Sequence, residues 1–250
     1  MSAIKYHLGD SILQAAFKEI DELFGTDWVG EAYKKLRKRY EEGEKAPELL
    51  WRLARATLEL ADIENDMARK RYLILEATSC AVEAAIYDEN NINTLRWAAV
   101  ATAYNSDYLF EMDKILEFKK TIEFTTKGLR LNQDDYILLF VRGRTIFNLC
   151  NLNSIEKRCV KQVFRLNGNE PSPTVGRARW YFLKSYEIEP KYLPNLLYLA
   201  LTHISQGDKD EASRFLHEAV DRRVEGSNAT VQAECAEILR HTMSTSLSDQ

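Results

Sequence analysis

The feature that most restricts the fold is a pair of amphipathic helical patterns on either side of a Gly-Asp turn near the C-terminus. Before and after Gly207-Asp208, apolar or small residues recur three and four positions apart, which is the spacing of one face of an α-helix. Ala200, Ala212 and Ala219 fall where two such helices cross. Because helices approach closely only where one side chain is short, these alanines indicate an antiparallel pair.

The same arrangement recurs three times upstream, with longer inserts. The first helix of each unit carries a small residue at the matching position: Ala54, Ala99, Gly143 and Ala200. These markers are 45, 44 and 57 residues apart, whereas a regular tetratricopeptide repeat has about 34 residues. We therefore expect an all-α, tetratricopeptide-like helical-repeat solenoid of antiparallel helix pairs with irregular insertions, the largest at 148–176.

The expected organisation is a single helical-repeat domain over residues 1–241. Its parts are an N-terminal helix pair at 10–42, repeat units at about 47–89, 92–133, 136–190 and 193–224, and a capping helix at 227–241. A solenoid needs such a cap to cover its last apolar face. The Ser- and Thr-rich residues 242–250 are expected to form a disordered tail.

The composition argues against several classes of protein. Hydrophobic residues make up 45% of the chain and its formal net charge is only -4, so a packed core is possible and a whole-molecule attraction to nucleic acid is not indicated. No stretch approaches the ~18 apolar residues of a membrane span, and the N-terminus lacks the apolar core of a signal peptide. The four scattered cysteines suit reduced thiols. We expect a cytoplasmic protein without a membrane span or a nucleic-acid partner.

Signals for catalysis are poor. The sequence contains no glycine-rich phosphate loop, no nucleophile elbow and no Cys-x-x-Cys pair. His203 and His217 could approach each other in the last repeat, but no cysteine or acid at ligand spacing completes a metal site. The sequence therefore predicts a non-catalytic protein with no metal and no cofactor.

Two segments resemble the regulator of microtubule dynamics family. The first reads ELLWRLARA at 48–56. The second begins at Lys157 and continues through NEPSPT at 169–174 and ARWYF at 178–182 to IEP at 188–190. The resemblance extends from the N-terminal helix pair to about residue 220, in matching order and with the same insertion.

This resemblance implies association with tubulin and microtubules at the cytoskeleton, the spindle and the spindle pole, and hence a role in chromosome segregation. Some members of the family carry an N-terminal membrane anchor and act at organelle contacts. The start of this sequence has no such apolar segment. We therefore expect a cytoplasmic or spindle role rather than that of the anchored branch.

Two basic helices are candidates for contact with the acidic microtubule lattice. The first, at 28–42, contains Lys34, Lys35, Arg37, Lys38 and Arg39. Glu31–Lys35, Arg37–Glu41 and Lys38–Glu42 are each four residues apart, so local pairs could neutralise three of these five cations. An ordinary solvated face and a microtubule-binding patch are both compatible with this pattern.

The second basic helix lies in the insertion, near 154–165. Lys157, Arg158, Lys161 and Arg165 fall on one side, and Val160, Val163 and Phe164 fall on the other. Few acids follow Glu156, and insertions in repeat proteins often bind partners, so the pattern slightly favours function over a plain surface helix. Ser172-Pro173, in the loop that follows, resembles a proline-directed phosphorylation site, a short motif that often occurs by chance.

A concave groove is expected along the first helices of the repeats. The candidate groove residues are Trp51, Arg55, Arg96, Phe140, Arg144, Phe147 and Leu197. Apolar side chains with interspersed arginines suit an extended peptide of a partner protein, or a phospholipid tail with an anionic head. The alternative is a groove filled by the chain's own termini or by its insertion.

The sequence thus predicts a non-catalytic scaffold that docks on microtubules through basic helices while its repeat groove holds a partner protein. One alternative is a phospholipid-binding or transfer module that uses the apolar groove. Another is a peptide-binding adaptor with no direct microtubule contact.

Overall fold

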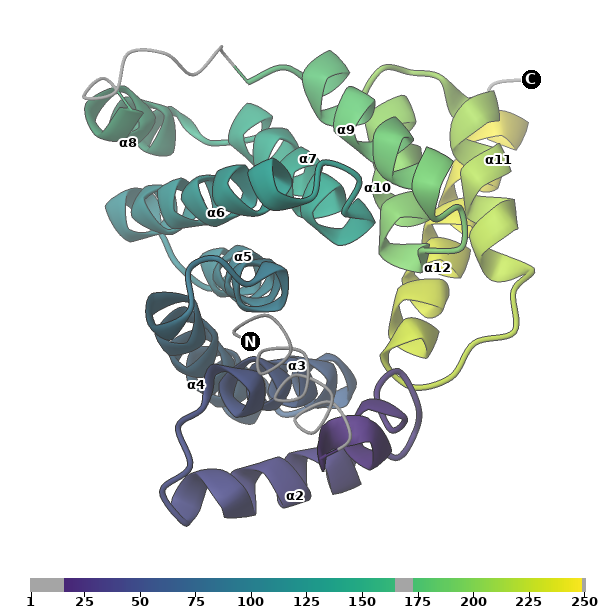
Figure 1. Ribbon diagram of the computed structural model, residues 1–250. Helices are drawn as coiled ribbons and strands as arrows, with labels where there is room; N and C mark the ends of the chain where they lie inside the picture. Colours follow the sequence, from purple (N-terminus) through teal and green to yellow (C-terminus); the bar gives the residue numbers. More distant parts are fainter. Residues whose placement is uncertain (1–15, 165–172, 249–250) are drawn as a thin grey trace.

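The computed structural model describes residues 16–164 and 173–248, and every regular element within these ranges is an α-helix (Figure 1). The helices are α2 (Val29–Glu41), α3 (Pro47–Ile63), α4 (Met67–Tyr87), α5 (Ile92–Ser106), α6 (Glu111–Leu131), α7 (Tyr136–Cys150), α8 (Ser154–Phe164), α9 (Val175–Ile188), α10 (Leu193–Ile204), α11 (Lys209–Val220) and α12 (Ser227–Ser248). Residues 16–21 form a further helical segment before α2. The expected all-α class is confirmed.

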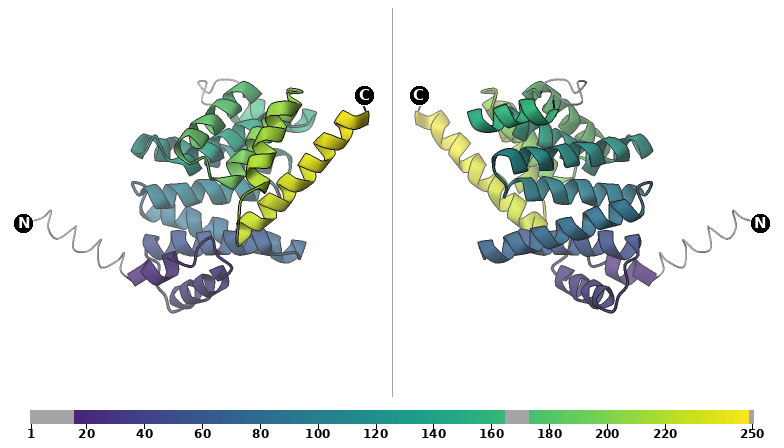
Figure 2. Two further views of the ribbon diagram at one scale, coloured as in Figure 1. Left: turned by 90° about the vertical axis from the view of Figure 1, so that its right-hand side faces the viewer. Right: turned by 90° about the vertical axis from the view of Figure 1, so that its left-hand side faces the viewer.

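The helices pack in pairs: α3 with α4, α5 with α6, α7 with α9, and α10 with α11. Successive pairs stack on one another, so the molecule is built in layers (Figure 2). The insertion between α7 and α9 supplies α8, which packs on the outside of α6 rather than entering the stack. The first helix of each pair, α3, α5, α7 or α10, therefore contributes one layer to the inner face of the stack.

The small residues that mark the repeats lie at close helix crossings. Ala54, Ala99 and Ala200 are completely buried. At Gly143 of α7, a Cβ atom would lie 2.7 Å from the Cε1 atom of Phe182 on α9, closer than carbon atoms pack. A Cβ atom at this position would therefore have to displace the Phe182 ring or widen the α7–α9 separation.

Side-chain caps define where several helices begin. The side chains of Asp66, Asn91, Asp135, Thr174 and Asp208 accept hydrogen bonds from backbone N–H groups in the first turns of α4, α5, α7, α9 and α11. Each cap satisfies a donor that has no partner within its own helix. The short turns between neighbouring helices are fixed in this way.

The last helix returns to the start of the stack. α12 packs on α10 and α11, as a cap does, but it also packs on α3 of the first repeat. The Gly226 N–H donates to Asp27 Oδ1 at 3.0 Å, and the Thr230 hydroxyl donates to the main-chain oxygen of Asp62 at 3.4 Å. Gly226 has a φ of +59°, and a Cβ atom there would lie 3.1 Å from the carbonyl oxygen of Thr26. A side chain at residue 226 would therefore disturb this contact.

The C-terminal helix is longer than the sequence suggested. We expected a capping helix that ends at 241 and a disordered tail at 242–250, but α12 continues to Ser248. No glycine or proline interrupts Ser227–Ser248. The helix is anchored by Cys235 and Leu239, which are buried in the core. Once a helix is nucleated and anchored, each further residue adds a hydrogen bond at little entropic cost, so the helix propagates until a breaker stops it.

The close crossing at Gly143 gives a first prediction. Gly143→Ala should lower the free energy of unfolding, because the new methyl group must displace Phe182 at a cost of about 1–3 kcal/mol. That cost exceeds the gain of up to about 1 kcal/mol that alanine brings to a helix. Chemical denaturation of the purified chain measures the change.

Gly176→Ala is the matched control, since nothing lies within 4 Å of a Cβ atom at that position in the first turn of α9. This variant should be as stable as the parent or slightly more stable. Equal stability of the two alanine variants would show that the α7–α9 crossing is not as close as described.

Candidate functional site

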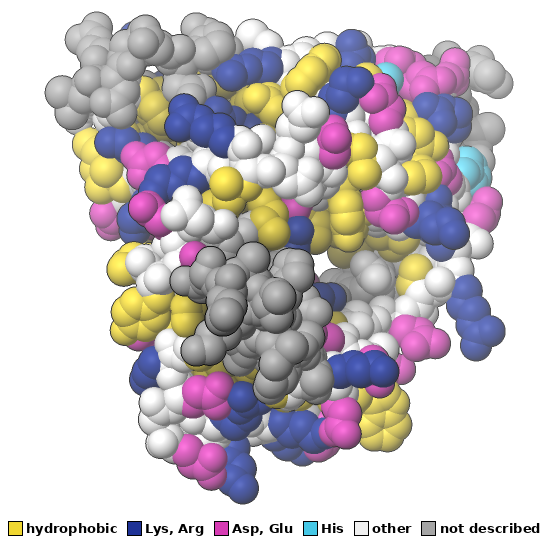
Figure 3. Space-filling model, viewed as in Figure 1, with side chains coloured by type: hydrophobic (Ala, Val, Ile, Leu, Met, Phe, Trp, Pro, Cys, Tyr) yellow, Lys and Arg dark blue, Asp and Glu magenta, His cyan; other side chains and the backbone are white. Residues whose placement is uncertain are grey.

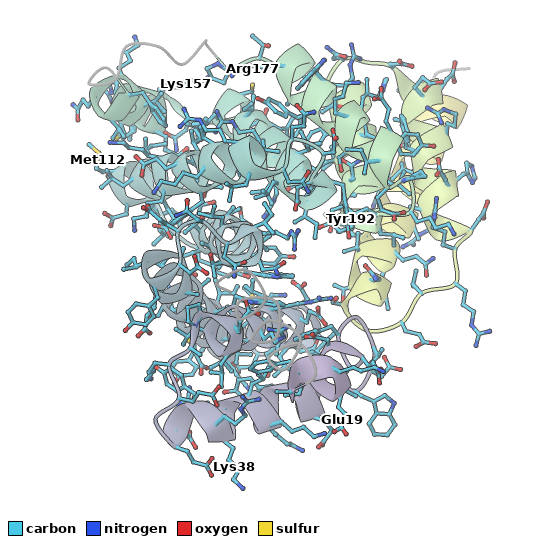
Figure 4. All side chains as sticks on the ribbon, viewed as in Figure 1. Glu19, Lys38, Met112, Lys157, Arg177 and Tyr192 are labelled. Atoms are coloured by element: carbon cyan, nitrogen blue, oxygen red, sulfur yellow. The ribbon has the colours of Figure 1, made fainter. Side chains whose placement is uncertain are left out.

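The inner face of the helical stack encloses a cavity of about 450 Å³. Its walls come from α3, α5, α7 and the N-terminal end of α10, and Gly25 and the first turns of α12 line the remaining side. The space-filling view shows the molecule hollowed between α5 and α12 (Figure 3). Tyr192, at the start of α10, lies beside this space (Figure 4). We call it the central cavity.

Five of the seven candidate groove residues line the central cavity, namely Trp51, Arg55, Arg96, Phe140 and Arg144. The other two, Phe147 and Leu197, are 8% and 5% exposed and belong to the hydrophobic core. The ring of Phe147 packs against that of Tyr198, with centroids 6.0 Å apart. At the start of α10 the cavity is lined by residues 191–194, so Leu197 lies beyond it.

Two of the cavity arginines are neutralised by carboxylates of the chain itself. Arg55 Nε donates to Glu59 Oε1 at 2.8 Å within α3. Arg96 Nε on α5 donates to Asp135 Oδ2, the N-cap of α7, also at 2.8 Å. Because these guanidinium charges already have partners, they are less available to an anionic ligand than the sequence suggested.

Arg144 is the most deeply enclosed cation of the central cavity. Its guanidinium lies over the rings of Tyr104 and Tyr198, at 5.0 and 5.7 Å from their centroids. Its Nε donates to the Tyr198 hydroxyl at 2.8 Å, and its Nη2 forms an ion pair with Asp107. The arginine thus ties α7 to α5 and α10, and its charge too is compensated.

Asp62, near the end of α3, is a cavity residue that the sequence analysis missed. The Tyr104 hydroxyl donates to its Oδ2 at 3.2 Å, and no Lys or Arg of the described residues forms an ion pair with it. Burial raises the pKa of the Asp62 carboxyl to about 6. The hydrogen bond from Tyr104 and the charges of Lys70 and Arg144 lower this pKa, while the charge of Glu59 raises it.

The raised pKa means that folding favours the protonated form of Asp62. The stabilising contribution of this group is fully present below its unfolded pKa, near 4, and is lost as the pH rises through about 6. At neutral pH the cavity therefore holds a carboxylate that costs stability, whereas its three arginines are paired.

The basic face of α2 is neutralised. Each of its five cations has an acidic partner: Lys34–Glu31 at 3.0 Å, Lys35–Glu19 at 3.7 Å, Arg37–Glu41 at 2.8 Å, Lys38–Glu42 at 3.9 Å and Arg39–Glu44 at 2.8 Å. Arg37 also forms an ion pair with Glu76 of α4. The spacing had suggested that Glu31 pairs with Lys35, but Glu31 pairs with Lys34. Acids outside the helix, Glu19, Glu42, Glu44 and Glu76, provide the additional compensation.

The cations of α8 have a different environment. Lys157, Arg158 and Lys161 are exposed, and none of them forms an ion pair with a residue in 16–164 or 173–248. The nearest acid in the helix, Glu156, is buried and forms an ion pair with Lys114 of α6 at 3.2 Å. Arg165 and Ser172 lie outside the described residues. The outer face of α8 is therefore a cationic surface.

The opposite face of α8 holds the helix on α6. Val163 is buried in a small hydrophobic cluster with Ile115, Phe118 and Ile122 of α6, and Val160 and Phe164 pack against it. Because this apolar face is occupied, the cations of α8 point away from the body. Lys157 lies at the opposite end of the molecule from Lys38 of α2 (Figure 4).

The two histidines of the last repeat do not form a common site. His203 Nδ1 lies 2.9 Å from Asp208 Oδ2, and its ring packs against Phe215 with centroids 5.7 Å apart. Among the described residues, no group of three His, Cys, Asp or Glu side chains could hold a metal ion. No helix in the described part of the chain is long and apolar enough to cross a bilayer.

Sequence comparison identifies the family. A family profile described as "Regulator of microtubule dynamics protein 1-3" matches residues 16–244. The chain belongs to this family. The resemblance seen in the residues at 48–56 and 157–190 is thereby confirmed.

Curated members of the regulator of microtubule dynamics family share about a quarter of the sequence. "Regulator of microtubule dynamics protein 1" of Caenorhabditis elegans is 27% identical over 226 residues, which cover 90% of this chain and 98% of the relative. The protein of the same name from Bos taurus is 27% identical, with 91% of this chain and 71% of the relative covered. With "Regulator of microtubule dynamics protein 2" of Rattus norvegicus the identity is 26%, and only 53% of that relative is covered.

A solved structure supports the repeat fold of this family member. The crystal structure of a thermophilic TPR protein of Thermus thermophilus superimposes with a TM-score of 0.62 at 14% identity, covering 92% of this chain and 98% of the other. The expected tetratricopeptide-like architecture is confirmed. At this identity the likeness shows the fold alone.

Asp62 gives a second prediction. Asp62→Asn should stabilise this regulator of microtubule dynamics family member at pH 7.5 by about 1–3 kcal/mol, because it removes the charge of a half-buried carboxylate and keeps an acceptor for Tyr104. The gain should vanish below pH 4, where the parent carboxyl is protonated in both states. Urea denaturation at several pH values measures it. Asp134→Asn, at an exposed acid, is the control. A less stable Asp62→Asn variant at pH 7.5 would contradict this assignment.

Proposed function

We propose that this chain is a non-catalytic scaffold that docks on microtubules through the outer face of α8 and holds a ligand in its central cavity. The proposal places it in the cytoplasm, at the cytoskeleton, the spindle and the spindle pole. Membership of the regulator of microtubule dynamics family supports the microtubule part of this function.

The observation that carries the docking site is the difference between the two basic helices. All five cations of α2 have carboxylate partners, whereas Lys157, Arg158 and Lys161 of α8 are exposed and form no ion pair with a described residue. A paired cation must give up its partner before it can contact an acidic surface, but an unpaired cation gives up only water. The surface of α8 is therefore the better docking site for the acidic microtubule lattice.

The shape of the central cavity favours a small ligand over an extended peptide. A peptide that runs along a solenoid needs an open groove, but Gly25 and the N-terminal turns of α12 line the open side here. The volume of about 450 Å³ lies within the range of small-molecule pockets, about 300–1,000 Å³. A phospholipid that inserts part of an apolar tail is the second candidate ligand, which Trp51, Leu58 and Phe140 of the cavity wall would contact.

The docking proposal predicts the effect of charge reversal. Changing Lys157, Arg158 and Lys161 together to Glu should weaken co-sedimentation with purified microtubules about tenfold or more. Each cation beside an acidic membrane surface contributes of the order of 1 kcal/mol, and a similar contribution is expected here. Binding by the parent should also fall as salt is added, because exposed charges are screened within about 8–10 Å.

A matched triple variant provides the control. Changing Lys34, Lys35 and Lys38 to Glu alters the net charge of the chain by the same amount, but at a surface whose cations are already paired, so the loss should be clearly smaller. Circular dichroism verifies that both variants keep their helices. Equal losses for the two triple variants, or none for the α8 variant, would refute docking through α8.

A further inference from the structure

Not every charge that lines the central cavity has an ion-pair partner. Its charged lining residues are Arg55, Glu59, Asp62, Arg96, Arg144 and Lys191. Each of the three arginines has a carboxylate partner, in Glu59, Asp135 and Asp107 respectively. Lys191 is exposed and therefore solvated. Asp62 is the carboxylate that remains, with a tyrosine hydroxyl as its hydrogen-bond donor and no cation of the described residues at ion-pair distance.

A carboxylate in this position favours one class of ligand. Removing a charge from water is costly unless an opposite charge compensates it, and Asp62 lacks such a partner. A cationic ligand would supply it, a neutral ligand would leave the cost in place, and an anion would be repelled. Each of the three neighbouring arginines has a carboxylate at ion-pair distance, whereas Asp62 has only the Tyr104 hydrogen bond and the charges of Lys70 and Arg144 beyond ion-pair distance.

The walls around the cavity also suit a cation. They include the aromatic side chains Trp51, Trp97, Tyr104, Tyr136 and Tyr192. An arginine already lies over the first three rings, so Tyr136 and Tyr192 are the rings without a cation among the described residues. Aromatic faces attract ammonium groups through the negative potential above the ring, and the attraction grows when water is excluded. The Tyr104 hydroxyl holds the Asp62 carboxylate in a fixed orientation at 3.2 Å. An ammonium group could therefore contact the carboxylate and at least one ring together.

We propose that the central cavity binds a small ligand through an ammonium group, with Asp62 as its counter-ion. The proposal rests on the ligand-binding role of the cavity and is independent of microtubule docking by α8. It names the chemical class of the ligand, a small amine with an apolar body, and the residue that recognises it. The apolar body would contact Leu58, Val100 and Phe140, which line the same cavity.

Three probes of equal length test the proposal. Hexylamine, 1-hexanol and hexanoate are titrated into the full chain at pH 7.5 by isothermal calorimetry. They share one apolar tail and differ only in whether the head group is cationic, neutral or anionic. Hexylamine should bind about tenfold or more tightly than hexanol, and hexanoate should bind most weakly, because only the ammonium group forms an ion pair with the carboxylate.

Two variants assign the effect to Asp62. Asp62→Asn should reduce the affinity for hexylamine about tenfold or more and change that for hexanol far less, because hexanol can still donate to the amide oxygen. Asp134→Asn removes an exposed carboxylate outside the cavity and should bind hexylamine as the parent does. A thermal scan of each variant confirms that it is folded.

The possible failures are distinguishable. If hexanol or hexanoate binds as tightly as hexylamine, or if Asp62→Asn binds hexylamine like the parent, ammonium recognition is overturned while a ligand-binding cavity stands. If none of the three probes binds at its solubility limit, the ligand-binding role of the cavity and this inference both fail. Microtubule docking by α8 is untouched by either result.

Discussion

The contact between α12 and α3 determines most of what is specific to this molecule. An open stack of helix pairs would present a long concave groove, but the last helix packs on the first repeat as well as on its own neighbours. Two hydrogen bonds join the two ends of the stack: the Gly226 N–H donates to Asp27, and the Thr230 hydroxyl donates to the main-chain oxygen of Asp62. A groove thereby becomes a cavity with walls from both ends of the chain, and Asp62 becomes part of an enclosed surface.

Local signals in the sequence were sufficient to predict the architecture of stacked helix pairs. Helical periodicity and small residues depend on neighbours a few positions apart or on the partner helix of the same unit, so Ala54, Ala99, Gly143 and Ala200 predicted the crossings. The amphipathic pattern of the insertion predicted the buried and exposed faces of α8 for the same reason. The length of α12 was underestimated because a Ser- and Thr-rich composition was taken as disorder although the segment contains no helix breaker.

The site was only partly predictable, because its charges are compensated over long sequence separations. Arg96 pairs with Asp135, 39 positions later, and Arg37 pairs with Glu76, also 39 positions later. No local spacing rule reveals such pairs, so the arginines of the groove and the cations of α2 looked more available than they are. Asp62 was missed because a single aspartate near a helix end carries no pattern. Only the return of α12 and the approach of Tyr104 make it a cavity residue.

The closure of α12 on α3 is tested most directly by measuring a distance across the contact between the two ends of the stack. Spin labels at residues 28 and 225, both exposed and next to the Asp27–Gly226 contact, are attached to a variant whose native cysteines are replaced by alanine, so that the buried positions 80 and 235 stay apolar. Closure predicts strong dipolar broadening in the electron paramagnetic resonance spectrum, from a single short distance. Spectra that equal the sum of the two singly labelled variants would contradict it, since they would show that the C-terminal helix stands away from the first repeat and that the groove is open.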